Sequence, residues 1–166
     1  MTTARQQRKS CLVPGLALGI AVFGGIFASP AILASPNDWI VVDAHSALAI
    51  SGFDPVAYFT EGKPKVGRPT MELRLDAVVW RFRNEGNRAA FAEHPEVYMP
   101  RFGGHDPVAL ARGASVPGHP LFWSVTGERL YLFYSAQARA AFLAGPGNII
   151  ERATRKWPEV ERTLGH

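Results

Sequence analysis

The 166-residue chain has only one cysteine, Cys11, and few charged residues, which make up 19% of the sequence. A single cysteine cannot form a disulfide within the chain, and it cannot build a thiolate metal cluster. With 47% hydrophobic residues, the composition is too apolar for a disordered chain, and neither a collagen-like nor a heptad repeat is present. The length allows one domain, or two very small ones, with enough chain to bury a true hydrophobic core.

The first 34 residues are typical of an export segment. Arg5, Arg8 and Lys9 precede an uncharged run from Cys11 to Ala34 that ends in small residues and prolines. No clean Ala-x-Ala cleavage site is present, and the 24-residue run is long enough to span a bilayer. The sequence thus predicts for residues 1–34 either a cleaved signal peptide or a retained membrane anchor. In both cases the positive start places the remaining chain outside the cytoplasm, in the periplasm.

Without residues 1–34 the chain is nearly neutral and free of cysteine. Lys plus Arg falls from 18 to 15 while all 14 acidic residues remain, so the formal net charge falls from +4 to +1. The remaining basic residues are scattered singly, whereas nucleic-acid binding needs a surface that neutralises phosphates. We therefore expect no nucleic-acid partner, and membrane contact only through the N-terminal segment if it is uncleaved.

The motifs of common enzyme classes are absent as well. The sequence contains no Gly-x-Ser-x-Gly elbow, His-Glu-x-x-His pair, Walker loop or Gly-x-Gly-x-x-Gly turn. Loss of Cys11 with the export segment would also exclude thiol chemistry. The sequence predicts that the protein is not an enzyme.

A repeat with a spacing of 51 residues organises the middle and the end of the chain. Residues 80–84 (Trp-Arg-Phe-Arg-Asn) align with 131–135 (Tyr-Leu-Phe-Tyr-Ser), and 88–91 (Arg-Ala-Ala-Phe) align with 139–142, which read the same. Apolar residues alternate at 78, 80 and 82 in the first copy and, less cleanly, at Leu130, Leu132 and Tyr134 in the second. Each alternation predicts a strand paired with an upstream strand, at 71–75 or 121–125. Each unit thus reads as a β-hairpin followed by a helix.

The helix of each unit has predictable ends. Asn84 and Ser135 are suitable N-caps, and each helix of about ten residues should end before Pro95 or Pro146 because the residue preceding proline avoids helical geometry. A last helix over residues 149–157 should stop at Pro158. Because a two-stranded hairpin alone is marginal in water, the two units are expected to pack their apolar faces together around five aromatic residues: Trp80, Phe82, Phe91, Phe133 and Phe142.

A distinctive motif occupies residues 51–63 (Ser-Gly-Phe-Asp-Pro-Val-Ala-Tyr-Phe-Thr-Glu-Gly-Lys), and further motifs lie at residues 80–82, 87–91, 95–98, 102–104, 130–132 and 157–158. Together these segments resemble the exported bacterial YHS-domain proteins. The resemblance covers residues 43–160. It implies a single small α+β domain related to metal-binding modules of the TRASH type, for which heavy-metal binding is the usual suggestion.

The chain departs from this family where a metal ligand would be expected. After Gly103 and Gly104 the family commonly has Tyr-Cys-Ala, whereas this chain has His105, Asp106 and Pro107. Imidazole and carboxylate suit zinc, copper(II), nickel or iron rather than copper(I). A site needs three or four ligands, so His119 is the candidate third ligand. Weaker candidates are Asp54, His94 and His45.

The same residues have structural alternatives. Asp54 and Asp106 each precede a proline, where a carboxylate commonly accepts hydrogen bonds from backbone amides. His105 could simply fill the space of an aromatic ring, and His119 reads as an exposed loop residue. Gly103 and Gly104 allow either a turn with positive φ or a close approach of a ligand to the backbone.

Two functions therefore stay open, with an enzyme as a distant third. The first is an extracytoplasmic binding module that holds a metal ion at the loop 103–106. The second is a non-catalytic interaction protein of the cell envelope, whose hairpin face docks a protein partner and whose ancestral metal site is lost. Single substitutions rarely rebuild a coordination shell, which favours the loss.

Overall fold

The computed structural model describes residues 39–75 and 77–164. The export segment predicted at residues 1–34 lies outside these ranges, as does Cys11. Within the described ranges, no helix is both long enough and apolar enough to cross a bilayer.

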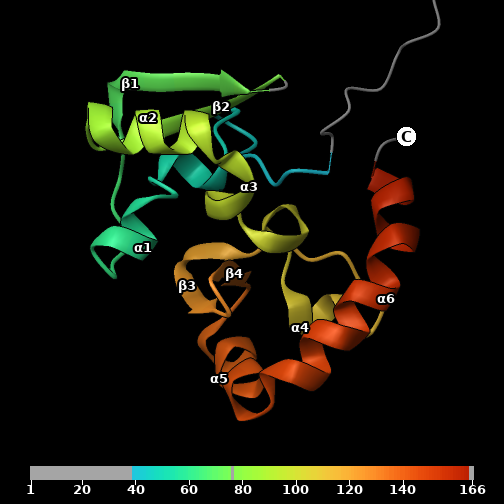
Figure 1. Ribbon diagram of the computed structural model, residues 1–166. Coiled ribbons are helices and arrows are strands. Elements are labelled where there is room, and N and C mark those ends of the chain that lie inside the picture. Colours follow the sequence, from blue (N-terminus) through green and yellow to red (C-terminus); the bar gives the residue numbers. More distant parts are fainter. Residues whose placement is uncertain (1–38, 76, 165–166) are drawn as a thin grey trace, which may run out of the picture. The chain divides into compact units, whose positions relative to one another are not determined.

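Two antiparallel β-hairpins, each followed by helices, make up the described chain (Figure 1). In chain order, the first repeat consists of η1 (Ile50–Gly52), α1 (Ala57–Thr60), β1 (Arg68–Leu75), β2 (Val78–Phe82), α2 (Glu85–Glu93) and α3 (Pro95–Tyr98). The second repeat consists of η2 (Arg101–Gly104), α4 (Pro107–Leu110), β3 (His119–Thr126), β4 (Arg129–Phe133), α5 (Ala136–Ala144) and α6 (Pro146–Leu164). The predicted α+β class, the two hairpin-plus-helix repeats and the C-terminal helix are confirmed.

Both hairpins have the same irregular register. In the second, His119 pairs with Phe133 and Trp123 with Leu132, so three residues of β3 bulge out between adjacent residues of β4. In the first, the same bulge follows the pairing of Arg68. The outer strands consequently begin earlier than the sequence predicts, because pairing resumes beyond the bulge. His119, expected in a loop, is instead the first residue of β3.

The helix caps are formed as the sequence predicts. Asn84 Oδ1 accepts a hydrogen bond from the Asn87 amide at 2.8 Å, and Ser135 Oγ accepts one from the Ala138 amide at 3.2 Å. Helices α2 and α5 end at Glu93 and at Ala144, ahead of the two prolines.

Helix α6 differs from its prediction. It begins at Pro146 and continues through Pro158 to Leu164, whereas the sequence predicts a stop at Pro158. Proline inside a helix removes one backbone hydrogen bond. The turn beyond it is held by the core instead, because Val160 is 6% exposed and Leu164 packs against the same cluster. Tertiary packing therefore extends the helix past its local stop signal.

The five aromatic residues predicted for the core are all fully buried. They do not form one core, however. Trp80, Phe82 and Phe91 belong to a first cluster, and Phe133 and Phe142 belong to a second. Neighbouring rings within each set are tilted relative to one another, with centroids 4.9–5.2 Å apart.

Strand β4 supplies side chains to both clusters. Leu130 and Leu132 lie in the first cluster, while Tyr131 and Phe133 lie in the second. Successive side chains of a strand point to opposite faces, and here both faces are covered. Continuous burial explains why the alternation is less clean in the second copy. Tyr134, expected to continue the strand pattern, lies beyond β4 and is 65% exposed.

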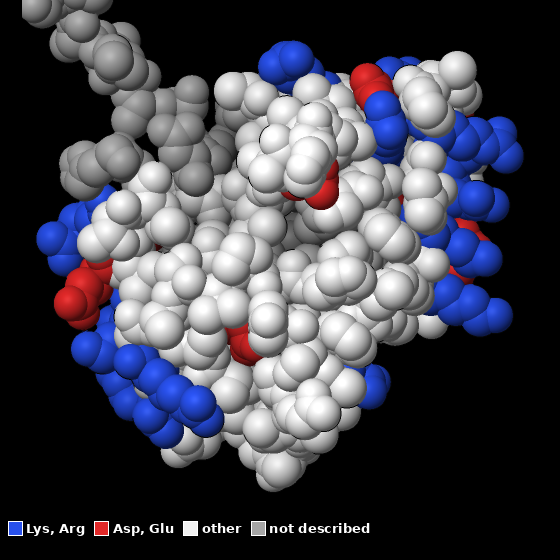
Figure 2. All heavy atoms as spheres, turned by 180° about the vertical axis from the view of Figure 1, so that it is seen from behind, with Lys and Arg blue, Asp and Glu red and all other residues white. Residues whose placement is uncertain are grey.

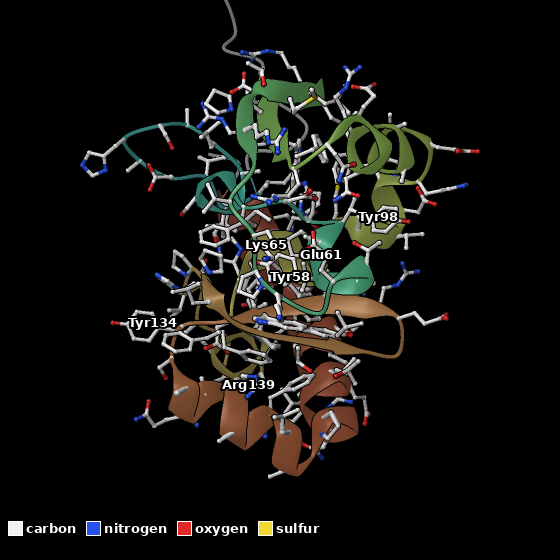
Figure 3. The ribbon with its side chains drawn as sticks, turned by 90° about the vertical axis from the view of Figure 1, so that its left-hand side faces the viewer. Tyr58, Glu61, Lys65, Tyr98, Tyr134 and Arg139 are labelled. Atoms are coloured by element: carbon white, nitrogen blue, oxygen red, sulfur yellow. The ribbon has the colours of Figure 1, made fainter. Side chains whose placement is uncertain are left out.

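Tyr58 joins the two repeats by a buried hydrogen bond. Its hydroxyl donates to the Pro120 carbonyl oxygen, in the bulge of β3, at 2.9 Å. Its ring meets the Trp123 ring edge-on at 5.2 Å. Figure 3 shows Tyr58 between the ribbon of the first repeat and strand β3. The second hairpin thus contacts the first repeat in two ways: β3 is bonded to helix α1, and β4 contributes Leu130 and Leu132 to the first cluster.

Replacing Tyr58 tests the contribution of this hydrogen bond to stability. Tyr58→Phe leaves the Pro120 carbonyl unpaired, and we expect the free energy of unfolding to fall by about 1–2 kcal/mol. Burial, and then the charge of Asp54, raise the pKa of Tyr58 above its ordinary 10.0. The unfolded chain therefore ionises first, and the wild type should lose stability as the pH rises past 10.0. Urea unfolding at neutral pH and above pH 10.0 should show a flatter alkaline decline for the variant; equal stabilities and equal declines would refute this role.

Candidate functional site

The loop that carries the candidate ligands is a structural repeat of an earlier loop. Residues 50–54 correspond to residues 102–106, and each loop runs through three consecutive residues with positive φ. The values are 43°, 53° and 75° at Ile50, Ser51 and Gly52, and 54°, 60° and 89° at Phe102, Gly103 and Gly104. The next residues, Phe53 and His105, both have extended backbone.

Asp106 uses both carboxylate oxygens within the fold. Its Oδ1 accepts a hydrogen bond from the Val108 amide at 2.8 Å, at the start of α4. Its Oδ2 accepts one from the Tyr134 amide at 3.0 Å, just after β4. The side chain is 2% exposed, so the carboxylate clamps the start of a short helix to the end of the hairpin.

Asp54 forms the same clamp in the first repeat. Its Oδ1 accepts from the Val56 amide at 2.9 Å, and its Oδ2 accepts from the Arg83 amide at 2.7 Å. Asn87 adds a side-chain amide donor at 2.6 Å. We refer to Asp54 and Asp106 as the aspartate clamps. Both act as the structural alternative predicts, by accepting backbone hydrogen bonds.

The sequence repeat also includes these clamps, which the 51-residue spacing does not reveal. Residues 54–57 and 106–109 both read Asp-Pro-Val-Ala, 52 positions apart, whereas the hairpins are 51 positions apart. The connection from clamp to hairpin is one residue shorter in the second copy. A comparison at a single spacing therefore overlooks the match, but the identical four-residue string was a sufficient signal.

His105 occupies the position of Phe53 in the first repeat. It is 5% exposed, and its ring lies 5.8 Å from the Trp157 ring. The Phe102 carbonyl oxygen lies 3.0 Å from His105 Nδ1, and since a carbonyl can only accept, Nδ1 carries the proton. Burial lowers the pKa of His105, partly opposed by this hydrogen bond. The ring is therefore a neutral aromatic component of the fold.

At Gly103 the backbone lies close to Trp39 of the same chain rather than to a ligand. A Cβ at this position would lie 2.3 Å from the Trp39 carbonyl oxygen. The Gly103 carbonyl accepts a hydrogen bond from the Val41 amide at 2.8 Å. Gly103 thus admits the segment that begins the described chain, and Gly104 continues the positive-φ turn.

His119 lies apart from the other candidate ligands in its contacts. It is exposed, its Nδ1 accepts from the Leu121 amide at 3.2 Å, and its ring lies 5.6 Å from that of Phe122. His94 is near Glu93 and Glu96 instead. Among the described residues, no group of three or more His, Cys, Asp or Glu side chains is placed to hold a metal ion.

Exposed apolar side chains gather near one end of the second hairpin. Leu121 is 54% exposed and Tyr134 is 65% exposed. Leu121 lies two residues after His119, and Tyr134 directly follows Phe133. His119 and Phe133 are paired in the sheet, so both exposed residues lie near the same end of the hairpin. We refer to His119, Leu121, Phe122 and Tyr134 as the hairpin-end patch. In Figure 3, Tyr134 projects outward from the molecule.

A hollow of about 430 Å³ lies between α1, α3 and the turn of the second hairpin. Its walls include Phe59, whose ring meets the Tyr98 ring edge-on at 5.4 Å. Arg129 lies at its border and donates to the Glu96 carbonyl oxygen at 2.9 Å. The hollow offers mainly apolar contact.

No protein-family model, curated protein or solved structure matches this chain. The resemblance to the exported YHS-domain proteins accordingly depends on the motifs of this sequence alone. Function therefore has to be inferred from the aspartate clamps, the hollow beside α1 and α3, and the hairpin-end patch.

The aspartate clamps should stabilise the fold strongly. In Asp106→Asn the new amide group cannot accept from the Tyr134 N–H, so we expect a loss of about 2 kcal/mol in the free energy of unfolding. Asp54→Asn should cost at least as much because its carboxylate accepts more hydrogen bonds. Asp43→Asn is the matched control, since Asp43 also accepts two backbone amides but in a surface turn. Chemical denaturation measures all three; equal effects at all sites would contradict the clamp.

His105 should make the fold sensitive to mild acid. Because its folded pKa lies below the ordinary 6.5, its contribution is complete above that pH and is lost as the pH falls through the folded pKa. His105→Phe copies the first repeat and should flatten the decline in stability between about pH 7 and about pH 5. His45→Gln, at an exposed position, is the control. An unchanged acid decline in His105→Phe would assign the sensitivity to other groups.

Proposed function

We propose that this chain is a non-catalytic interaction protein of the cell envelope that binds a partner protein through the hairpin-end patch. The observation that carries the proposal is the exposure of Leu121 and Tyr134, which lie in chain segments without Asp, Glu, Lys or Arg. The periplasmic location rests on residues 1–34, which read as a signal peptide or anchor.

The surroundings of the patch are poor in charge. Residues 113–127 and 130–138 contain no Asp, Glu, Lys or Arg. Figure 2 shows that the face opposite that of Figure 1 is mostly uncharged, with some Asp or Glu atoms within it and Lys and Arg gathered at its margins. The cores of protein interfaces are likewise depleted in charged residues and enriched in tyrosine, which supports a protein as the partner.

Hydrogen bonds hold the backbone of the patch. The Tyr134 amide is bound to the Asp106 clamp, and the Leu121 amide is bound to His119 Nδ1. A surface held in one conformation loses less entropy on binding. On this proposal the second clamp is a positioning device for the patch.

The proposal includes kinship with the exported YHS-domain proteins and loss of their ancestral metal site. It is supported by the residues that stand at that loop. Both oxygens of Asp106 accept backbone hydrogen bonds, and His105 takes the place that Phe53 has in the first repeat. Nothing in their contacts favours zinc, copper(II), nickel or iron over this structural use.

Site-directed photocrosslinking tests the proposal in cells that export the full chain. With Tyr134 replaced by p-benzoylphenylalanine, we expect one partner protein to be crosslinked. Adding Leu121→Asp should reduce that product by about fivefold or more, because a buried charge opposes docking. The matched control carries the crosslinker in place of Leu143, which is 47% exposed on α5.

Two results would contradict the proposal. One is a product that forms equally well from positions 134 and 143, or that Leu121→Asp leaves unchanged. The other is a stoichiometric transition metal in the purified protein that is lost in both His105→Ala and His119→Ala. That second result would instead favour the metal-binding module.

A further inference from the structure

A second hollow, of about 260 Å³, lies beside η2 and α6. It is independent of the hairpin-end patch and shares no residue with it. Its lining includes three aromatic residues and one residue of each charge sign: Trp39, Phe102, Trp157, Met99, Pro100, Glu96 and Arg101. Phe102 is buried, whereas Glu96 and Arg101 are exposed.

The three aromatic rings form walls at steep angles to one another. The Trp39 and Trp157 rings lie 5.9 Å apart with an angle of 82° between their planes. The Phe102 and Trp157 rings lie 5.7 Å apart at 55°. Rings at such angles present more than one π-face and edge to the same space, which is the arrangement that surrounds a methylated ammonium group in aromatic cages.

The neighbouring charges favour a cation over an anion. Glu96 lines the hollow, and its carboxylate Oε1 lies 3.7 Å from His94 Nδ1. The guanidinium of Arg101 is already engaged, because it lies 5.3 Å from the centre of the Phe102 ring. An anionic ligand would therefore compete with Phe102 for Arg101, whereas a soft cation gains from the rings of Trp39 and Trp157.

We propose that this hollow binds a small methylated ammonium group against the rings of Trp39 and Trp157, next to the Phe102 ring that Arg101 covers. Met99 adds a polarisable wall without charge. The group could be carried by a free solute or by a lipid headgroup, and the chemistry of recognition is the same for both.

Calorimetry and NMR of the full chain test this site with choline and tetramethylammonium. The matched neutral probe is 3,3-dimethyl-1-butanol, which has the shape of choline but no charge. We expect 1:1 binding of the cations and roughly three- to thirtyfold weaker binding of the neutral probe, the range that cation–π attraction supplies. Equal affinities, or no binding up to about 10 mM, would overturn the proposal.

The four tryptophans serve as reporters within one experiment. Choline should shift the indole N–H resonances of Trp39 and Trp157, which line the hollow, but not those of Trp80 and Trp123. Shifts at all four, or only at the latter two, would place the ligand elsewhere. Vesicles of phosphatidylcholine distinguish the sources: competition with free choline indicates a headgroup, and no competition indicates a free solute.

Variants at the exposed border avoid damage to the fold. Glu96→Gln should weaken choline binding at least about twofold, and Arg101→Gln should strengthen it, while Arg101→Lys should not. Trp157→Leu keeps apolar bulk but removes the π-face, and should weaken the cation far more than the neutral probe. If charge at positions 96 and 101 has no effect and Trp157→Leu affects both probes equally, the site is not a cation site. Leu121→Asp should leave choline binding intact, which separates this proposal from the proposed partner surface.

Discussion

The fold depends on burying both faces of one short strand. Strand β4 has Leu130 and Leu132 on one face and Tyr131 and Phe133 on the other, and each pair belongs to a different core cluster. A single hairpin cannot cover two faces, so the first repeat and the helices that follow β4 must both pack on it. The first repeat completes one cluster, and α5 and α6 complete the other. Neither cluster is complete without the second hairpin, which explains why two repeats behave as one domain.

Within each repeat, a buried aspartate connects parts that secondary structure leaves unconnected. The loop before each hairpin has strained backbone, including positive φ at Ile50 and Phe102, and such conformations persist only when surrounding contacts hold them. The clamps Asp54 and Asp106 end these loops, and each accepts one backbone amide at the start of the short helix that follows the loop and another just after the hairpin.

Comparison of the two repeats distinguishes residues that they share from residues that differ. The shared residues, such as the two clamps, stabilise the fold. In the second repeat, the rings of Trp39 and Trp157 also pack near η2.

The two proposed binding features follow from this division. The second hairpin has spare surface because its bulge turns Leu121 outward while β4 stays buried. The second loop has a neighbouring hollow because α6 continues past Pro158 and brings Trp157 against Phe102 and His105. The first repeat ends in the short helix α3 at the corresponding place. Both proposed binding features thus involve the second repeat, which at the hollow is joined by Trp39, Glu96 and Met99 from the preceding chain.

Much of the fold was predictable because its signals are local. Alternating apolar residues identified both hairpins, Asn84 and Ser135 identified the starts of the helices, and the five core aromatics were all recognised. The candidate site was predictable only as a set of residues, since Asp106 could be read equally as a ligand or as an acceptor for backbone amides. The sequence by itself determined the repeated unit, because periodicity and capping act over a few neighbouring residues. Tertiary structure decided which core cluster each face of β4 joins and how far α6 extends. It also decided that both oxygens of Asp106 accept backbone hydrogen bonds and that the Trp39 ring contacts the Trp157 ring. These outcomes depend on contacts between residues far apart in the chain, and no local pattern encodes such distances.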